Sequence, residues 1–332
     1  MRNQNCRNWI VIFSICFILI NISCYKCKKN EDTRFILGTI INIKIYQTDG
    51  KKAKEVIKNV FDEIERVDSI FSNFKEDSII SKINRNSGIW TDVSKEVIEL
   101  LESSVKHSNL TDGAFDISIA PIVNLWGFGP SRKNYIPDDK EISDKLSLVN
   151  YKNIEIDKEK NRVRIKNGMC LEPGGIVKIY ALDRAVKVLK EAGIKSALVN
   201  AGGDIYALGE KQKGEPFKIG IQDPRDEKEI LEYLEISDAA VITSGDYENY
   251  FIENDKRYHH IFDPKTGYSG KLCRSVTIVS KDIYIPSIGI FVLGPEKGIK
   301  LIESLPGVEC LIVDGSGKII TSKGFDKYIA KK

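Results

Sequence analysis

Residues 41–71 read INIKIYQTDGKKAKEVIKNVFDEIERVDSIF, and the two halves of this stretch have different periodicities. Ile41, Ile43 and Ile45 alternate with other side chains, which is the period of a half-buried strand. Across residues 51–71, apolar side chains recur at helical spacing between charged ones. The stretch therefore predicts a strand that opens the folded part of the chain and leads into a long amphipathic helix.

Further helices and short strands are predicted downstream, and no internal repeat is present. Ser94 can cap a helix that runs through Val97 to Val105, and residues 178–192 form a third predicted helix, which Gly193 ends. The predicted strands are rich in β-branched residues and cover 197–200, 217–221, 239–243, 275–280 and 308–314. This mixture predicts an α+β fold with mixed β-sheets and flanking helices.

The composition limits the class of protein. The chain has 332 residues, of which 42% are hydrophobic and 29% charged, so it can bury a core for one large domain or two tightly joined lobes. The net charge of +3, from 50 basic and 47 acidic side chains, is too small to indicate a nucleic-acid partner.

The first residues have the pattern of an export signal. Arg2 and Arg7 precede an apolar run at 9–22, which suits a signal peptide and is short for a membrane-spanning helix. Ser23 before Cys24 fits a lipoprotein signal peptide at 1–23 with Cys24 as the lipidated residue, followed by a tether at 24–34. The sequence thus predicts an exported, membrane-anchored lipoprotein, facing the periplasm. An uncleaved N-terminal anchor is the alternative.

The segment 111–130 combines glycines and aromatic residues with the carboxylate of Asp116. Aromatic rings bury flat areas, glycine lets the backbone approach a ligand closely, and a carboxylate can accept a hydrogen bond from a ring N–H or a sugar hydroxyl. The segment could enclose a planar ring. An ordinary packed loop explains the same residues.

Two glycine pairs lie near a lysine. Gly174 and Gly175 precede Lys178, and a second pair lies in the segment 200–204, which ends in a carboxylate. Backbone amides exposed by glycine can bind phosphate oxygens, and Lys178 could add a positive charge. Tight turns or a strand bend are the alternative reading.

The segment 259–267 contains two of the three histidines of the chain, and His260 is the better acid/base candidate. An imidazole with a pKa near neutrality can accept a proton from a hydroxyl group. His259 and His260 are neighbours on an expected strand, where side chains face opposite ways, so a shared metal ion is not expected.

Taken in chain order, these segments resemble the motif series of the FAD:protein FMN transferase family. The resemblance runs from about residue 37 to about residue 298. The ordered combination carries it, with motifs at 37–39, 71–78 together with Asn84, 113–116, 126–129, 172–178, 200–204, 244–247 and 260–267. It implies an ApbE-like two-lobed fold over residues 35–325 that encloses an FAD site.

By this resemblance, particular residues are expected to contact FAD: Leu37, Phe74, Ala114, Phe115, Asp116, Glu172, Lys178 and Ile261. The family usually has aspartate where Glu172 stands, so the charge is kept. The implied reaction transfers FMN from FAD to a Ser or Thr hydroxyl of an acceptor flavoprotein and releases AMP. It implies a divalent metal such as Mg²⁺ to neutralise charge, with His260 assisting the hydroxyl.

The expected metal loop departs from the family pattern. Tyr284 stands where the family usually has aspartate, and Ile288 stands where it has threonine. Neither side chain is a good oxygen ligand for Mg²⁺, which leaves Ser287 and the backbone carbonyl of Gly175 as expected ligands, with Asp282 as a possible substitute. Two alternatives to the transferase follow from this departure: an exported flavin-binding lipoprotein without transferase activity, or an FAD pyrophosphatase.

Overall fold

The computed structural model describes residues 30–129, 133–282, 284–285 and 287–331. The predicted signal peptide and Cys24 lie outside the described residues. Among the residues that are described, no helix has both the length and the apolar character needed to cross a membrane.

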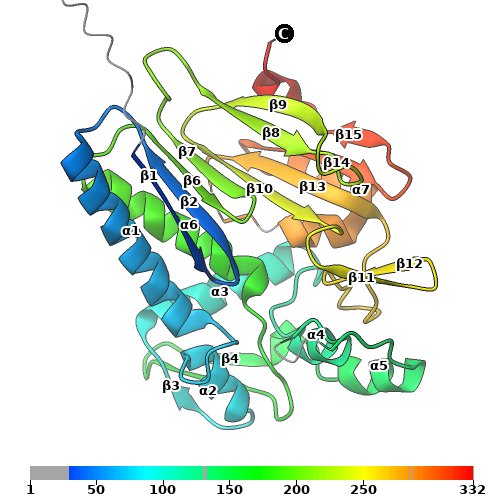
Figure 1. Cartoon of the computed structure of the whole chain (residues 1–332). Helices are drawn as coiled ribbons and strands as arrows, with labels where there is room; N and C mark the ends of the chain where they lie inside the picture. The colour runs from blue at the N-terminus through cyan, green and yellow to red at the C-terminus, as the bar shows by residue number, and fades with distance from the viewer. Residues whose placement is uncertain (1–29, 130–132, 283, 286, 332) are drawn as a thin grey trace, which may run out of the picture.

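One eight-stranded sheet forms the centre of the molecule (Figure 1). Its strand order is β1-β2-β6-β7-β10-β13-β14-β15, and all neighbouring strands are antiparallel. The strands are β1 (Asn30–Ile36), β2 (Thr39–Ile45), β6 (Ala197–Ala201), β7 (Asp204–Leu208), β10 (Ala239–Gly245), β13 (Cys273–Ser280), β14 (Val308–Asp314) and β15 (Ile319–Thr321). The strand predicted at 217–221 is β8 (Phe217–Gln222), which pairs with β9 (Ile230–Ile236) in a separate hairpin. All five predicted strands, and the opening strand at β2, are therefore confirmed.

Helices cover one face of this sheet. The helix α1 (Gly50–Phe71) and the helix α6 (Gly174–Glu191) pack together over β1, β2, β6 and β7, whereas α7 (Ser287–Glu303) packs on β10, β13 and β14. Neighbouring residues divide between the two faces: Ile242 belongs to the core beneath α1 and α6, and Val241 belongs to a core beneath the β8–β9 hairpin. The predicted amphipathic helix is confirmed, because its apolar positions from Ala53 to Phe71 are buried.

A smaller lobe lies beyond one end of the sheet (Figure 1). It contains α2 (Ile79–Arg85), α3 (Lys95–Leu110), α4 (Ala120–Leu125), α5 (Asp139–Leu146) and a three-stranded sheet of β3 (Thr91–Asp92), β5 (Arg162–Ile165) and β4 (Ile154–Asp157). Another hairpin, β11 (Tyr250–Glu253) with β12 (Lys256–His259), projects beside it. The predicted α+β fold is confirmed.

The predicted domain boundaries need correction at both ends. The tether at 24–34 is wrong from Asn30 onward, because residues 30–36 form β1 and pair with β2. β1 lies at the edge of the sheet and its residues 31–33 are exposed, so it lacks the apolar alternation that would have identified it. The domain also continues past residue 325, since the amide of Ala330 donates to the carbonyl of Tyr233.

Candidate functional site

A cavity of about 330 Å³ lies where the end of the large sheet meets the smaller lobe. It is lined by segments far apart in the sequence: 37–39, 114–119, 172–179, 202–204, 242–249, 260–264 and 287–288, with Phe74 and a few further side chains. Apart from the possible substitute ligand Asp282, every residue predicted from the sequence to have a role in the site lines this one cavity: Leu37, Phe74, Ala114, Phe115, Asp116, Glu172, Gly175, Lys178, His260, Ile261 and Ser287. The fold brings them together, and their individual roles stay predictions.

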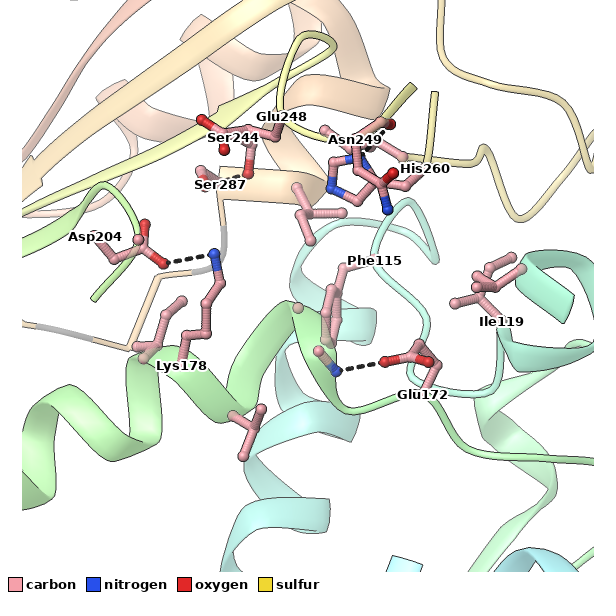
Figure 2. Close-up of a pocket in the computed structure, with 18 of the residues that line it drawn as sticks. Phe115, Ile119, Glu172, Lys178, Asp204, Ser244, Glu248, Asn249, His260 and Ser287 are labelled. Carbon is pink, nitrogen blue, oxygen red and sulfur yellow. Dashed lines mark hydrogen bonds and ion pairs between the residues drawn. The ribbon is translucent and has the colours of Figure 1, made fainter. Parts of the chain in front are cut away.

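The first turn of α6 forms one wall of the cavity. The Glu172 carboxylate accepts a hydrogen bond from the Gly174 amide at 2.9 Å and another from the side chain of Asn73, and burial raises the pKa of this carboxyl group (Figure 2). At Gly175 a Cβ atom would lie 2.8 Å from Cδ1 of Ile288 and 3.1 Å from Cε2 of Phe115. A glycine is therefore needed there for the aromatic ring to pack against the helix.

Asp116 fixes the loop that carries Phe115. Its carboxylate accepts hydrogen bonds from the amide and the hydroxyl of Ser118, at 2.8 and 2.7 Å, and from the amide of Tyr151 at 2.9 Å. Burial raises the pKa of Asp116, and these donors oppose the rise by stabilising the charged form. The side chain lines the cavity, but most of its hydrogen-bonding capacity is used within the protein.

Trp126 turns out to be part of the core of the smaller lobe. It is 1% exposed, it packs with Phe128 and Phe262, and its indole N–H donates to the carbonyl of Gly267 at 2.9 Å. In the predicted ring-binding segment, the packed-loop alternative therefore holds for Trp126, whereas Phe115 and Phe128 line the cavity.

Lys178 supplies the positive charge of the cavity. Its Nζ lies 3.4 Å from Oδ2 of Asp204, which is 3% exposed and also accepts a hydrogen bond from the Thr243 amide (Figure 2). The Asp204 carboxylate raises the pKa of Lys178, so the ammonium group stays charged. Among the described residues that line the cavity, Lys178 is the only lysine or arginine.

Sequence reasoning did not select Asp204 or Glu248 as site residues. Asp204 ends the second glycine motif, so its signal was present; Glu248 had none. Glu248 lines the cavity, and its burial raises the pKa of its carboxyl group, while the nearby Lys178 lowers it. Three charged groups, Lys178, Asp204 and Glu248, therefore face one another at this end of the cavity.

His260 has the form required of a base. Nδ1 lies 3.2 Å from the backbone carbonyl oxygen of Asn249, which only accepts hydrogen bonds, so Nδ1 carries the proton (Figure 2). Burial, together with the neighbouring His259 and Lys178, lowers the pKa of His260 to about 4, so the ring is neutral near pH 7. It follows that Nε2 carries a free lone pair.

His259 points elsewhere, as the sequence predicted. It is 4% exposed, its Nε2 lies 2.7 Å from the carbonyl of Gly270, and its ring contacts Phe291. It does not line the cavity that contains His260. The adjacent histidines cannot share a metal ion, and His259 has a structural role.

The predicted metal ligands, Gly175 and Ser287, do not form a site that fits Mg²⁺. The hydroxyl of Ser287 is hydrogen-bonded to that of Ser244 at 2.6 Å, and the apolar end of Ile288 packs beside Gly175. One oxygen of the Asp282 carboxylate accepts the amide of Tyr284 at 3.0 Å, and Asp282 is not among the residues that line the cavity. Within the described part of the chain, no group of three or more His, Cys, Asp or Glu residues could hold a metal ion.

Comparison with known proteins gives consistent matches. A model of the ApbE family matches residues 37–312. A curated FAD:protein FMN transferase of Vibrio cholerae is 29% identical and aligns over 98% of this chain and 100% of its own length, and one of Klebsiella pneumoniae is 31% identical over 86% of this chain and 90% of its own. The crystal structure of an ApbE protein from Thermotoga maritima has a TM-score of 0.85 at 34% identity and covers 92% of this chain and 100% of that protein. A flavin transferase ApbE from Vibrio cholerae has a TM-score of 0.82 at 27% identity, covering 91% of this chain and 99% of that one.

Proposed function

The chain belongs to the ApbE family, and from this premise we propose that it transfers FMN from FAD to a Ser or Thr hydroxyl of an acceptor flavoprotein. One observation carries the proposal: a neutral histidine with a free Nε2 and a charged lysine face the same cavity, which all the predicted flavin-contacting residues line. The neutral histidine can take the proton of a hydroxyl nucleophile, and the charged lysine can neutralise a diphosphate.

The reaction is a displacement at phosphorus. The acceptor hydroxyl oxygen forms a bond to the phosphorus of the FMN half of FAD, and the bond between that phosphorus and the bridging oxygen breaks. AMP leaves with the bridging oxygen, and Nε2 of His260 takes the proton of the hydroxyl. The proton is later released from His260 to solvent, and the phosphate of the departing AMP carries the negative charge, so protons and charge balance.

The other residues bind and orient the substrate. Lys178 places its charge toward the diphosphate, and Phe115 and Phe128 offer aromatic surface for a ring. The fixed hydrogen bond from Nδ1 of His260 to Asn249 holds the imidazole so that Nε2 stays the accepting atom. The residues in the expected metal loop do not fit a divalent ion, so charge neutralisation and proton transfer rest on side chains of the protein itself.

A direct assay separates the transferase from its alternatives. The full-length chain is incubated in detergent with FAD, Mg²⁺ and an acceptor protein that carries a flavinylation site, and AMP release and covalent acceptor fluorescence are followed together. We expect equal amounts of AMP and flavin-labelled acceptor. AMP with free FMN and no labelled acceptor would mean hydrolysis, and tight FAD binding with neither product would mean a flavin-binding protein.

We also propose that the chain is exported and anchored to the membrane, facing the periplasm. The support is the sequence of the leader, in which Arg2 and Arg7 precede an apolar run that ends just before Ser23 and Cys24. The unaltered protein should take up labelled fatty acid and have the size of the processed chain, and Cys24→Ala should abolish both the labelling and the processing. Membrane association of the unaltered protein without lipid labelling would instead indicate an uncleaved anchor.

A further inference from the structure

Tyr284 is built into the wall of the protein, away from the cavity. Its hydroxyl donates to the Asp183 carboxylate on α6 at 3.1 Å, its ring packs near that of Tyr180, and it is not among the residues that line the cavity. Burial and the nearby Asp183 raise the pKa of Tyr284, so its hydroxyl stays protonated and donates. The loop is thus tied to α6 by a Tyr284–Asp183 hydrogen bond.

Two further side chains in the described part of the loop also make hydrogen bonds. The Ser287 hydroxyl is hydrogen-bonded to that of Ser244, and the Asp282 carboxylate accepts a hydrogen bond from the amide of Tyr284. The side chain of Ile288 fills the space beside Gly175 and Phe115. A divalent ion such as Mg²⁺ requires near-octahedral oxygen coordination, which would demand breaking these contacts. The described part of the loop is closed by hydrogen bonds and apolar packing.

The cavity nevertheless has a fixed cation of its own. Lys178 Nζ lies 3.4 Å from Asp204, and Glu248 also faces it across the cavity. An ammonium group does not impose octahedral coordination, and it can neutralise phosphate oxygens as a point charge.

We propose that this protein binds the diphosphate of its flavin dinucleotide without a divalent cation, with Lys178 as the charge that neutralises it. The inference rests on the proposed function for the identity of the ligand. The inference concerns only whether a divalent cation is needed to bind the diphosphate, so it can fail while the proposed function stands.

The first test compares FAD affinity of the full-length protein with excess Mg²⁺ and with EDTA, using the quenching of flavin fluorescence. We expect the two dissociation constants to agree within about twofold. Tightening by about tenfold or more with Mg²⁺ would overturn the proposal. If FAD binds under neither condition, the proposed function fails and the inference fails with it, which is a different result from Mg²⁺-dependent binding.

The alternative to be tested is a divalent cation held by the carboxylates of Asp204 and Glu248. If the unaltered protein responds to Mg²⁺ and Glu248→Gln abolishes the response, the cation is held at this pair and the proposal is wrong. If Glu248→Gln changes FAD affinity equally with Mg²⁺ and with EDTA, Glu248 does not act through a bound cation, which agrees with the proposal.

A restored loop provides the positive control. In the double variant Tyr284→Asp/Ile288→Thr, the two oxygen ligands that the family resemblance places at these positions are returned. We expect this variant to gain FAD affinity with Mg²⁺ by about tenfold or more, and to gain thermal stability with Mg²⁺ alone, because the ion would neutralise the introduced carboxylate. The neutral variant Tyr284→Asn/Ile288→Thr matches it in size and should respond weakly or not at all. A Mg²⁺ response of the unaltered protein as large as the tenfold response expected of the restored variant would contradict the proposal.

Discussion

Replacing His260 by alanine is expected to slow FMN transfer by about 10²–10⁴-fold while FAD affinity changes little. The reason is that Nδ1 is occupied by the Asn249 carbonyl, so Nε2 is the atom that can take the proton of the acceptor hydroxyl. Single-turnover transfer to the acceptor measures the rate, and flavin fluorescence measures the affinity.

His260→Asn is the matched control for this prediction. An asparagine amide can still donate to the Asn249 carbonyl, but it cannot accept a proton as a base. Both variants should therefore lose the transfer rate to a similar extent. A His260→Asn variant that keeps most of the rate would show that the ring only positions other groups.

The dependence on pH follows from the lowered pKa of His260. Since the pKa is about 4 instead of the ordinary 6.5, the base form persists in the free enzyme well below neutral pH. The ratio kcat/KM should thus show no decline from His260 between pH 8 and pH 5, and should fall only as the pH approaches about 4. The unfolded chain binds this proton at higher pH than the folded chain, so the stability contributed by His260 is lost as the pH falls from about 6.5 to about 4.

The sequence predicted most elements of the fold because their apolar residues face a core. Ile41, Ile43 and Ile45 are completely buried, and their alternation identified β2. β1 was missed because it has a neighbour on one side only, so its polar residues stay exposed. Periodicity reports burial, and an edge strand with little burial gives a weak signal.

The site was predicted through motifs, and the features that the motifs did not predict depend on contacts made only in the folded chain. His260 and Lys178 have side chains that declare their chemistry, but the hydrogen bond that sets the tautomer of His260 comes from the backbone carbonyl of Asn249. Every residue has such a carbonyl, so no residue type marks it. The burial that gives Glu248 its position beside Lys178 likewise depends on segments that meet only in the folded chain.

The Tyr284–Asp183 contact explains how the chain tolerates the changed loop. The Tyr284 hydroxyl donates a hydrogen bond to the Asp183 carboxylate, which an ionised aspartate at this position could not do. Ile288 adds apolar packing against Gly175 and Phe115. Both side chains that depart from the expected family pattern therefore make ordinary protein contacts.

Replacing Lys178 by methionine is expected to weaken FAD binding by about 10–100-fold and to leave riboflavin binding unchanged within about twofold. Methionine keeps much of the length of the side chain, but it removes the single lysine or arginine among the described cavity-lining residues. Riboflavin has no phosphate, so it tests the ring-binding part of the cavity alone. Lys187→Met, at an exposed position on the same helix, is the control and should alter neither affinity.

The same substitution should also reduce stability, because Asp204 is left buried without its cation. Breaking a fully buried pair costs about 3–5 kcal/mol, and the cost here is smaller because the Lys178 side chain is 32% exposed and Asp204 can take up a proton. Urea denaturation should show that Lys178→Met/Asp204→Asn recovers stability relative to Lys178→Met. If the double variant recovers stability while FAD affinity stays low, the lysine charge acts on the diphosphate itself. If FAD and riboflavin affinities fall together in both variants, Lys178 instead maintains the shape of the cavity, and its assignment to the diphosphate is wrong.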